Sequence, residues 1–232
     1  IEDAAQGMMS QYKGKQLGSI GHLGAYSFHE TKNYTSGGEG GLLIINDDRF
    51  VERAEIIREK GTNRSSFFRG QVDKYTWVDL GSSYLPCELQ AAYLWGQLEK
   101  SDEINQNRLD AWNSYYSELK SLEISDQVQL PTVPENCEHN AHMFYLKLKN
   151  LEQRAAFIEY LKVNEIMSVF HYIPLHTSPA GKQFGRFNEK DTFTTKHSEM
   201  LVRLPIWYGI TPAEIKHIIQ VVKVFFIDNI NG

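Results

Sequence analysis

Residues 24–45 constrain the fold of this chain more than any other stretch. An apolar run ends at Ser27, the chain is then polar as far as Lys32, and a glycine-rich segment at 37–41 leads into a second apolar run at 40–45. We expect the second run to be a strand. A helix should follow it, capped by residues 46–48 and closed by residues 60–61. Strands and helices in this order are typical of an α/β protein.

Lys32 carries the most reactive chemistry in this stretch. Desolvation and a cationic neighbour lower the pKa of a lysine and make its amine a nucleophile, which is what a Schiff base with an aldehyde requires. Taken alone, a lysine beside an asparagine and several glycines is usually a solvated loop residue. The presence of Asp3 and Ser27 in the same sequence favours a functional role for Lys32 over a solvated loop position. A pyridoxal phosphate enzyme needs a carboxylate at the pyridine nitrogen, a lysine amine and donors for the phosphate, and these residues are of those types.

Three sequence blocks then point to one family. Residues 3–6, 27–33 and 38–41 resemble the motifs of the DegT/StrS-type sugar-nucleotide aminotransferases, and residues 59–64, 67–77 and 170–176 narrow the match within that family. The similarity covers the whole chain. It implies the α/β fold of the fold type I (aspartate aminotransferase-like) pyridoxal-phosphate-dependent transferases. Residues 1–125 would be the C-terminal part of the large cofactor-binding domain with its connecting helix, and residues 126–232 a small α+β domain. The first part of the large domain would then be missing, and we expect the chain to be inactive alone.

The resemblance also implies roles for individual residues around pyridoxal 5'-phosphate. Lys32 would be the catalytic residue and the covalent tether. Asp3 would contact the ring nitrogen, Gln6 the phenolic oxygen and Ser27 the phosphate. Ser83 stands where many members have an asparagine that reaches the phosphate across a subunit interface, and its hydroxyl can still donate one hydrogen bond.

Cationic residues in a long irregular stretch suggest a nucleotide-sugar site. Residues 62–85 show no regular period, and Arg64, Arg69 and Lys74 alternate there with aromatic residues. Guanidinium groups suit phosphates, and aromatic rings suit a base or a sugar. A loop whose rings pack on the core and whose cations face water explains the composition equally well; the resemblance favours the binding role.

Three further candidates lie around Pro174. By resemblance, His171, Tyr172 and His176 lie near the substrate, where neutral imidazole or phenol groups could bind sugar hydroxyls. From spacing alone, a packing or capping role is the more common one for a histidine at the end of a strand.

Composition excludes several other classes of function. A net charge of −5 gives no support to nucleic-acid binding, and no apolar run is long enough to cross a bilayer. The N-terminus has no signal-peptide pattern. Cys87 and Cys137 are far apart and lack metal-ligand spacing, so we expect free thiols, a reducing cytoplasmic environment and no metal.

The second half of the chain reads as a series of amphipathic elements. A helix from residue 88 is apolar all round, which predicts burial in its domain or against another subunit. The pattern turns amphipathic from Ile104 to Leu119. Prolines at 131 and 134 mark a boundary. Strands at 142–148 and 166–172 flank a helix at 151–164 with residues 155, 158 and 161 inward, and residues 211–214 form a capping box for a last helix.

The leading hypothesis is therefore an aminotransferase for a nucleotide-linked 4-keto-6-deoxysugar, with L-glutamate as amino donor and with homodimeric sites. Residues 62–85 and 89–98 are the candidates for the dimer contact. Three alternatives remain open: a pyridoxamine-dependent sugar dehydratase, a non-catalytic or regulatory protein on the same fold, and a folding or dimerisation remnant. The dehydratases of this family have a histidine in place of the lysine, so Lys32 argues against the first.

Overall fold

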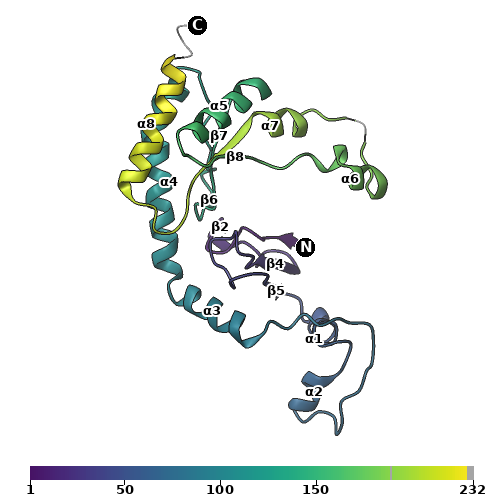
Figure 1. The fold of residues 1–232 in the computed structure, drawn as a ribbon. Helices are drawn as coiled ribbons and strands as arrows, with labels where there is room; N and C mark the ends of the chain where they lie inside the picture. The colour runs from purple at the N-terminus through teal and green to yellow at the C-terminus, as the bar shows by residue number, and fades with distance from the viewer. Residues whose placement is uncertain (189, 229–232) are drawn as a thin grey trace. The chain divides into compact units, whose positions relative to one another are not determined.

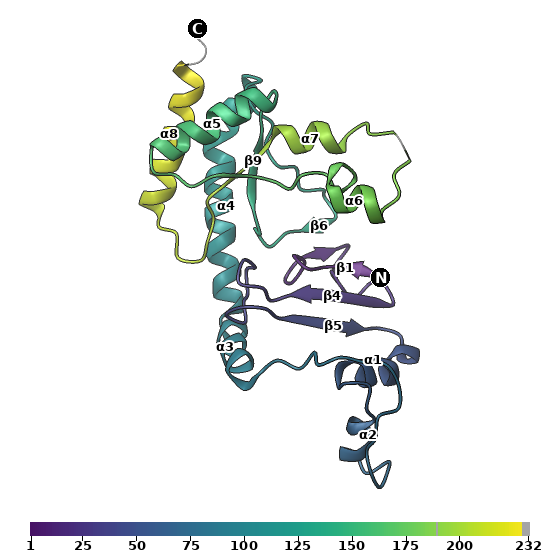
Figure 2. The same cartoon turned by 45° about the vertical axis from the view of Figure 1, so that its right-hand side comes forward.

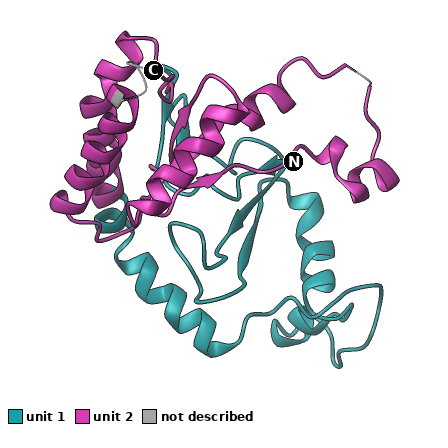
Figure 3. Ribbon diagram, turned by 45° about the horizontal axis from the view of Figure 1, so that its top comes forward, with its two compact units in different colours: residues 1–105, 134–140 teal, residues 106–133, 141–232 magenta. Residues whose placement is uncertain are grey.

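The structure of the protein is a computed structural model that describes residues 1–188 and 190–228. The chain divides into two compact units, coloured separately in Figure 3. Unit 1 contains residues 1–105 and 134–140, and unit 2 contains residues 106–133 and 141–232. No helix among the described residues has both the length and the apolar character needed to span a membrane.

Unit 1 contains two three-stranded sheets. The first has the order β1-β4-β5, formed by β1 (Glu2–Asp3), β4 (Leu23–Ser27) and β5 (Gly41–Ile45) (Figures 1 and 2). β1 is parallel to β4, and β4 is antiparallel to β5. The second has the order β3-β2-β6, formed by β3 (Lys15–Gln16), β2 (Gln11–Tyr12) and β6 (Cys137–Glu138). The strand predicted at 40–45 is confirmed.

The helix after β5 begins and ends as predicted. Asp47 accepts a hydrogen bond from the Arg49 amide at the start of the 3-10 turn η1 (Asp48–Phe50), and α1 (Val51–Arg58) follows. Lys60 and Gly61 then have φ values of 63° and 76°. A Cβ at Gly61 would lie 1.8 Å from the Asp79 carbonyl oxygen, so only glycine fits this C-terminal turn.

The structure differs from two expectations for residues 62–99. A short helix, α2 (Arg64–Phe68), lies where no regular element was predicted. The helix predicted from residue 88 is α3 (Glu88–Glu99), but none of its residues is buried, and the side chains of Leu89 and Trp95 are 83% and 66% exposed. The described residues therefore do not bury α3, and its predicted burial in the rest of the domain or against another subunit stays a prediction.

Unit 2 is built on one antiparallel sheet with the order β7-β9-β8, formed by β7 (Phe144–Lys147), β9 (Leu201–Leu204) and β8 (Val169–Phe170). One face of β7 and β9 is fully buried and carries Phe144, Leu146, Val202 and Leu204. The strand predicted at 142–148 is confirmed. The strand predicted at 166–172 is shorter: Pro205, which has no amide, follows β9 at one end of the ladder, and α7 ends at Met200 directly before β9 at the other.

Helices cover the buried face of this sheet. They are α4 (Ser101–Ile124), which crosses the unit boundary, α5 (Leu151–Val163) and α8 (Pro212–Asp228). The remaining helical elements are η2 (Leu175–Thr177), α6 (Pro179–Phe184) and α7 (Thr194–Met200). In α5 the predicted inward residue Ala155 is exposed, and Phe157 is buried instead.

The predicted capping box of α8 is confirmed. Glu214 accepts hydrogen bonds from the Thr211 amide and hydroxyl, both at 2.7 Å, and the Thr211 hydroxyl accepts from the Glu214 amide at 3.2 Å. The predicted apolar face of the helix is also buried, at Ile215, Ile218, Ile219, Val222 and Phe226.

Candidate functional site

Strand register brings Asp3 and Ser27 to one face of a sheet. Asp3 pairs with Ala25 across the parallel β1-β4 ladder. Ser27 lies two residues further along β4 and therefore on the same face as Ala25. The Asp3 carboxylate is exposed and accepts one hydrogen bond, from the Ala5 amide at 3.2 Å. The Ser27 hydroxyl accepts one from the His29 amide at 3.3 Å.

The neighbouring carboxylate, Glu2, projects to the opposite face of the sheet. It accepts hydrogen bonds from the backbone amides of Gly18, Ile20 and Gly21. The bonds from Gly21 and Gly18 hold the pKa of Glu2 below its ordinary value. Glu2 thus anchors the turn at 18–21, whereas Asp3 remains open to a ligand.

Lys32 lies in a tight turn just after β4. Its amide donates to the His29 carbonyl at 2.9 Å, and its side chain is half-buried. Among the described residues its ammonium group has no hydrogen-bond or ion-pair partner. Ser36 closes the loop after the turn, because its amide and its hydroxyl both donate to the Phe28 carbonyl. Hydrogen bonds on both sides of Lys32 therefore hold the loop that presents the amine.

A buried amide pair supports the same loop. Asn33 donates to the Asn140 carbonyl at 2.9 Å, and the Asn140 side chain donates to the carbonyls of Gln6 and Met8 at 2.7 and 2.8 Å. The Gln6 side chain itself is exposed. Asn140 therefore links the turn after β1 to the residue next to Lys32. The sequence interpretation did not identify Asn140, because its partners lie more than 100 residues away.

The structure brings Arg64 and Ser83 together in a cavity of about 160 Å³. Residues 58–60 run beside residues 82–84, with the Lys60 amide donating to the Ser82 carbonyl at 3.0 Å. Arg58 and Lys60 also line this cavity. Three cations therefore line the cavity together with the Glu59 carboxylate, which pairs with Arg58 at 2.9 Å, and with the hydroxyls of Thr62, Tyr75 and Ser83. The sequence had predicted Arg64 and Ser83 as binding residues, but it did not single out Arg58 or Lys60.

The other two cations of this segment lie apart from that cavity. Arg69 forms a bidentate ion pair with Glu55, with N–O distances of 2.8 and 2.7 Å. This pair holds the pKa of Glu55 below its ordinary value and fixes the residue after α2 to α1. Lys74 is exposed.

In unit 2, His171 and Tyr172 are neighbours whose ring centroids are 4.9 Å apart. The Tyr172 side chain is 72% exposed. Burial, together with the charge of Arg203, lowers the pKa of His171 below its ordinary value. The imidazole of His171 is therefore neutral at neutral pH, as a partner for sugar hydroxyls should be.

His176 is held by two neighbours. Its Nε2 lies 2.9 Å from the Asp191 carboxylate, and its ring stacks on Phe187 with centroids 4.1 Å apart. The carboxylate fixes which ring nitrogen remains for another partner. Asp191 and Phe187 were not identified from the sequence.

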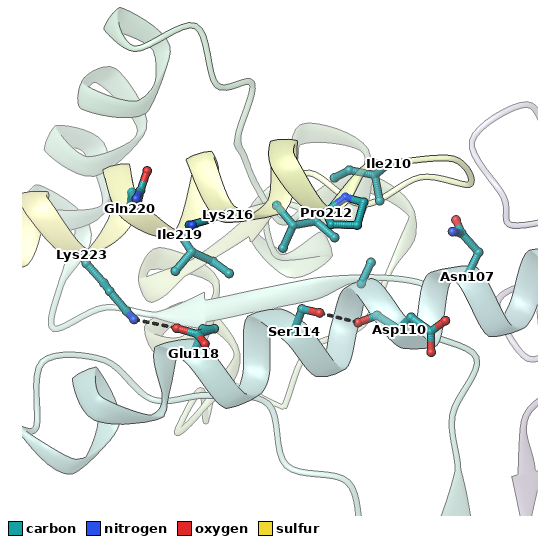
Figure 4. A pocket seen from close by; sticks show the side chains of 12 residues that line it. Asn107, Asp110, Ser114, Glu118, Ile210, Pro212, Lys216, Ile219, Gln220 and Lys223 are labelled. Atoms are coloured by element: carbon teal, nitrogen blue, oxygen red, sulfur yellow. Dashed lines mark hydrogen bonds and ion pairs between the residues drawn. The ribbon is translucent and has the colours of Figure 1, made fainter.

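A further cavity of about 540 Å³ lies between α4 and α8 (Figure 4). Its lining includes the apolar residues Ala111, Ile215 and Ile219, together with Lys223 and Glu118, which form an ion pair at 3.0 Å. None of the predicted site residues lines it. Within the described part of the chain, no cluster of three or more His, Cys, Asp or Glu side chains is arranged to hold a metal.

Comparison with known proteins identifies the family. Residues 1–223 match the model of the DegT/DnrJ/EryC1/StrS aminotransferase family, and the chain belongs to that family. It is 31% identical to the dTDP-3-amino-3,6-dideoxy-alpha-D-galactopyranose transaminase of Aneurinibacillus thermoaerophilus, over 96% of this chain and 57% of the relative. It is 28% identical to the pleiotropic regulatory protein of Geobacillus stearothermophilus, over 97% of this chain and 58% of the relative.

A solved structure confirms the predicted fold class. Helicobacter pylori PseC, an aminotransferase involved in the biosynthesis of pseudoaminic acid, matches with a TM-score of 0.84 and 21% identity, over 97% of this chain and 59% of that structure. The fold is that of the pyridoxal-phosphate-dependent sugar aminotransferases, fold type I. The chain spans less than two thirds of the length of these proteins.

Proposed function

We propose that this chain is part of a pyridoxal-phosphate-dependent aminotransferase that transfers the amino group of L-glutamate to a nucleotide-linked 4-keto-6-deoxysugar. The observation that carries the proposal is the shared sheet face of Asp3 and Ser27, followed directly by the turn that presents Lys32. Family membership supports it.

The residues present fit the cofactor. Asp3, Gln6, Ser27 and Lys32 offer a carboxylate, an amide, a hydroxyl and an amine, and none of these groups bonds to another side chain within the described residues. Pyridoxal phosphate supplies an electron-withdrawing ring that stabilises negative charge on the carbon from which a proton is removed. Asp3 would hold the ring nitrogen protonated, Gln6 would donate to the phenolic oxygen, and Ser27 would donate to the phosphate. Ser83 would donate to the phosphate in the partner subunit.

Lys32 would serve as both tether and proton carrier. Its half-buried position limits competition from water. When its amine is free, Lys32 would act as the general base that takes the proton from the donor Cα and as the general acid that gives it to the neighbouring carbon of the cofactor. The amino donor would react and its keto product would leave before the nucleotide sugar binds, and this order gives ping-pong kinetics.

The remaining candidates would bind the nucleotide sugar. Arg64 and Lys74 are assigned to the diphosphate, together with Arg69, whose guanidinium is already engaged by Glu55. The imidazoles and phenol of His171, Tyr172 and His176 are assigned to the sugar hydroxyls.

The finer proposal rests on sequence resemblance. Residues 59–64, 67–77 and 170–176 resemble those of the dTDP-4-oxo-6-deoxy-D-glucose transaminase, which makes dTDP-4-amino-4,6-dideoxygalactose for enterobacterial common antigen. We assign the same substrate here, in a cytoplasmic homodimer with shared sites. We also propose that residues 1–125 belong to the large domain and residues 126–232 to the small one; the compact units of the structure instead divide after residue 105, and residues 134–140 return to unit 1. The exposed side chains of α3 support a role for that helix in the dimer contact.

A regulatory role is the second candidate, because one relative is named a pleiotropic regulatory protein. A non-catalytic protein has no need of the Asp3 and Lys32 chemistry, and both residues are retained here. This favours the enzyme.

The test is an absorbance scan of the full-length protein with pyridoxal phosphate, before and after borohydride. We expect a visible band that borohydride abolishes, and a mass increase on the peptide that contains Lys32. Lys32→Ala should lose both, whereas Lys216→Ala, which changes an exposed lysine of α8, should keep them. A label on any other lysine would refute the assignment. A half-reaction assay with TDP- and UDP-linked 4-keto sugars then decides the substrate.

A further inference from the structure

The face of the unit 2 sheet opposite the core carries the polar residues Tyr145, Lys147 and Arg203 next to the apolar residues Val169 and Leu201. Arg203 on β9 pairs with Tyr145 on β7 and with Val169 on β8. Paired residues project to the same face, so Arg203 and Tyr145 lie side by side across adjacent strands. Both side chains are half-buried.

Arg203 lacks the partner that such a position requires. Its Nε is buried and makes no hydrogen bond, and its guanidinium forms no ion pair with any described residue. A buried donor without an acceptor costs free energy, and a charged one costs more. Buried arginines in folded proteins are therefore normally paired with an anion.

His171 adds a second unsatisfied group close by. It follows Phe170, the last residue of β8, and its Nδ1 is buried without a partner. The charge of Arg203 acts on its imidazole. Tyr145 stays protonated because burial raises its pKa, so its hydroxyl remains a donor.

We propose that Arg203 and Tyr145, beside His171, form a carboxylate-binding site on the face of the β7-β9-β8 sheet opposite the core. A single guanidinium with its planar fork matches one carboxylate in both charge and geometry. A diphosphate carries more charge than this site neutralises. Building on the function proposed above, we assign the bound molecule as the amino donor, an amino acid with a free carboxylate.

A direct binding test needs no catalysis. The protein is labelled with 15N-arginine, and the Nε–H signals are followed while glutarate, a dicarboxylate without an amine, is added at constant ionic strength. Arg203→Lys assigns the Arg203 signal by its disappearance. Arg186→Lys, which changes an exposed arginine of the same unit, should leave that signal in place. We expect glutarate to shift the Arg203 signal and inorganic phosphate to shift it far less.

Two results would overturn the site: no shift with either anion, or a shift with phosphate alone. Both are read in the unaltered protein, so misfolding of a variant cannot cause them. They are also independent of transamination. If the protein transfers no amino group and glutarate still shifts the Arg203 signal, the proposed function fails and the carboxylate site stands.

Kinetics test the assignment of the bound molecule. Arg203→Lys keeps the charge but removes the fork, so we expect the KM for L-glutamate to rise about 10-fold or more, in line with the loss of a charge-assisted hydrogen bond. The KM for the nucleotide sugar should change much less. Equal increases in both constants would indicate a structural role and refute the amino-donor assignment.

Discussion

The sharpest structural prediction concerns Gly40, which lies between the Lys32 turn and β5. A Cβ at this position would lie 2.5 Å from the Ser36 hydroxyl and 3.0 Å from the Ser36 Cβ. Ser36 is 4% exposed, and its hydroxyl is bonded to the carbonyls of Phe28 and Glu39 at 3.1 and 2.9 Å. Gly40→Ala must therefore displace a buried hydroxyl from its acceptors.

The size of the effect follows from those contacts. Leaving a buried acceptor unpaired costs about 1–3 kcal/mol, and overpacking adds about 1–3 kcal/mol. We expect a loss of about 2–4 kcal/mol in the free energy of unfolding, measured by urea denaturation. For a chain of this size that corresponds to a fall in Tm of roughly 4–16 °C. Retention of pyridoxal phosphate should fall as well, because the same turn presents Lys32.

Gly38→Ala is the matched control. The nearest atom to a Cβ there is the Gln90 side-chain nitrogen at 3.8 Å, an ordinary contact. We expect little change in stability. Ser36→Ala should cost less in the Gly40→Ala protein than in the unaltered one, because the closest clash is with the hydroxyl that it removes. Equal stabilities of the Gly40→Ala and Gly38→Ala proteins would refute the steric argument.

Three further predictions follow from pairs seen in the structure. If Arg69 binds the substrate, Arg69→Gln should raise the KM for the nucleotide sugar more than the KM for L-glutamate, and more than Glu55→Gln raises the KM for the nucleotide sugar. Equal increases in the KM values of both substrates would show that Arg69 acts only through its ion pair with Glu55. Hydrogen bonds from Thr211 hold the pKa of Glu214 below 4.5. The ionised Glu214 carboxylate therefore stabilises the fold fully above its ordinary pKa, and this stabilisation is lost as the pH falls through the lowered pKa. In a plot of the urea midpoint against pH, the Glu214→Gln protein should show a smaller fall at acid pH than the unaltered protein. Tyr115→Phe removes a hydrogen bond of 2.9 Å in the core of unit 2 and should cost about 1–2 kcal/mol by urea denaturation, with an unchanged m-value.

Local patterns predicted most of the regular elements. The strand at 40–45, the helix after it and the capping box at 211–214 depend on residues close together in sequence, and all three are confirmed. The errors arose where tertiary context decides. Ala155 and Phe157 are both compatible with a helix, and only packing against α8 selects Phe157 for burial. Residues 166–172 read as a strand, but the partner strand ends before Pro205.

The candidate site was less predictable than the fold. Residue types identified Asp3, Ser27 and Lys32, but the common face of the first two follows from strand register, which no local pattern specifies. The pairing of Arg69 with Glu55 likewise joins residues 14 apart in the sequence, one just after α2 and the other on α1. Arg203 was not considered at all, because an isolated arginine in a short apolar strand has no distinctive sequence signal.

The return of residues 134–140 to unit 1 makes that unit discontinuous in the gene. β6 is the edge partner of β2, and Asn140 reaches back to the carbonyls of Gln6 and Met8. On the ribosome, unit 1 cannot complete its fold until residue 140 has emerged, although its first 105 residues are made much earlier. A truncation after residue 105 would leave β2 with an open edge, and shortened versions of this protein should therefore aggregate rather than yield an isolated first unit.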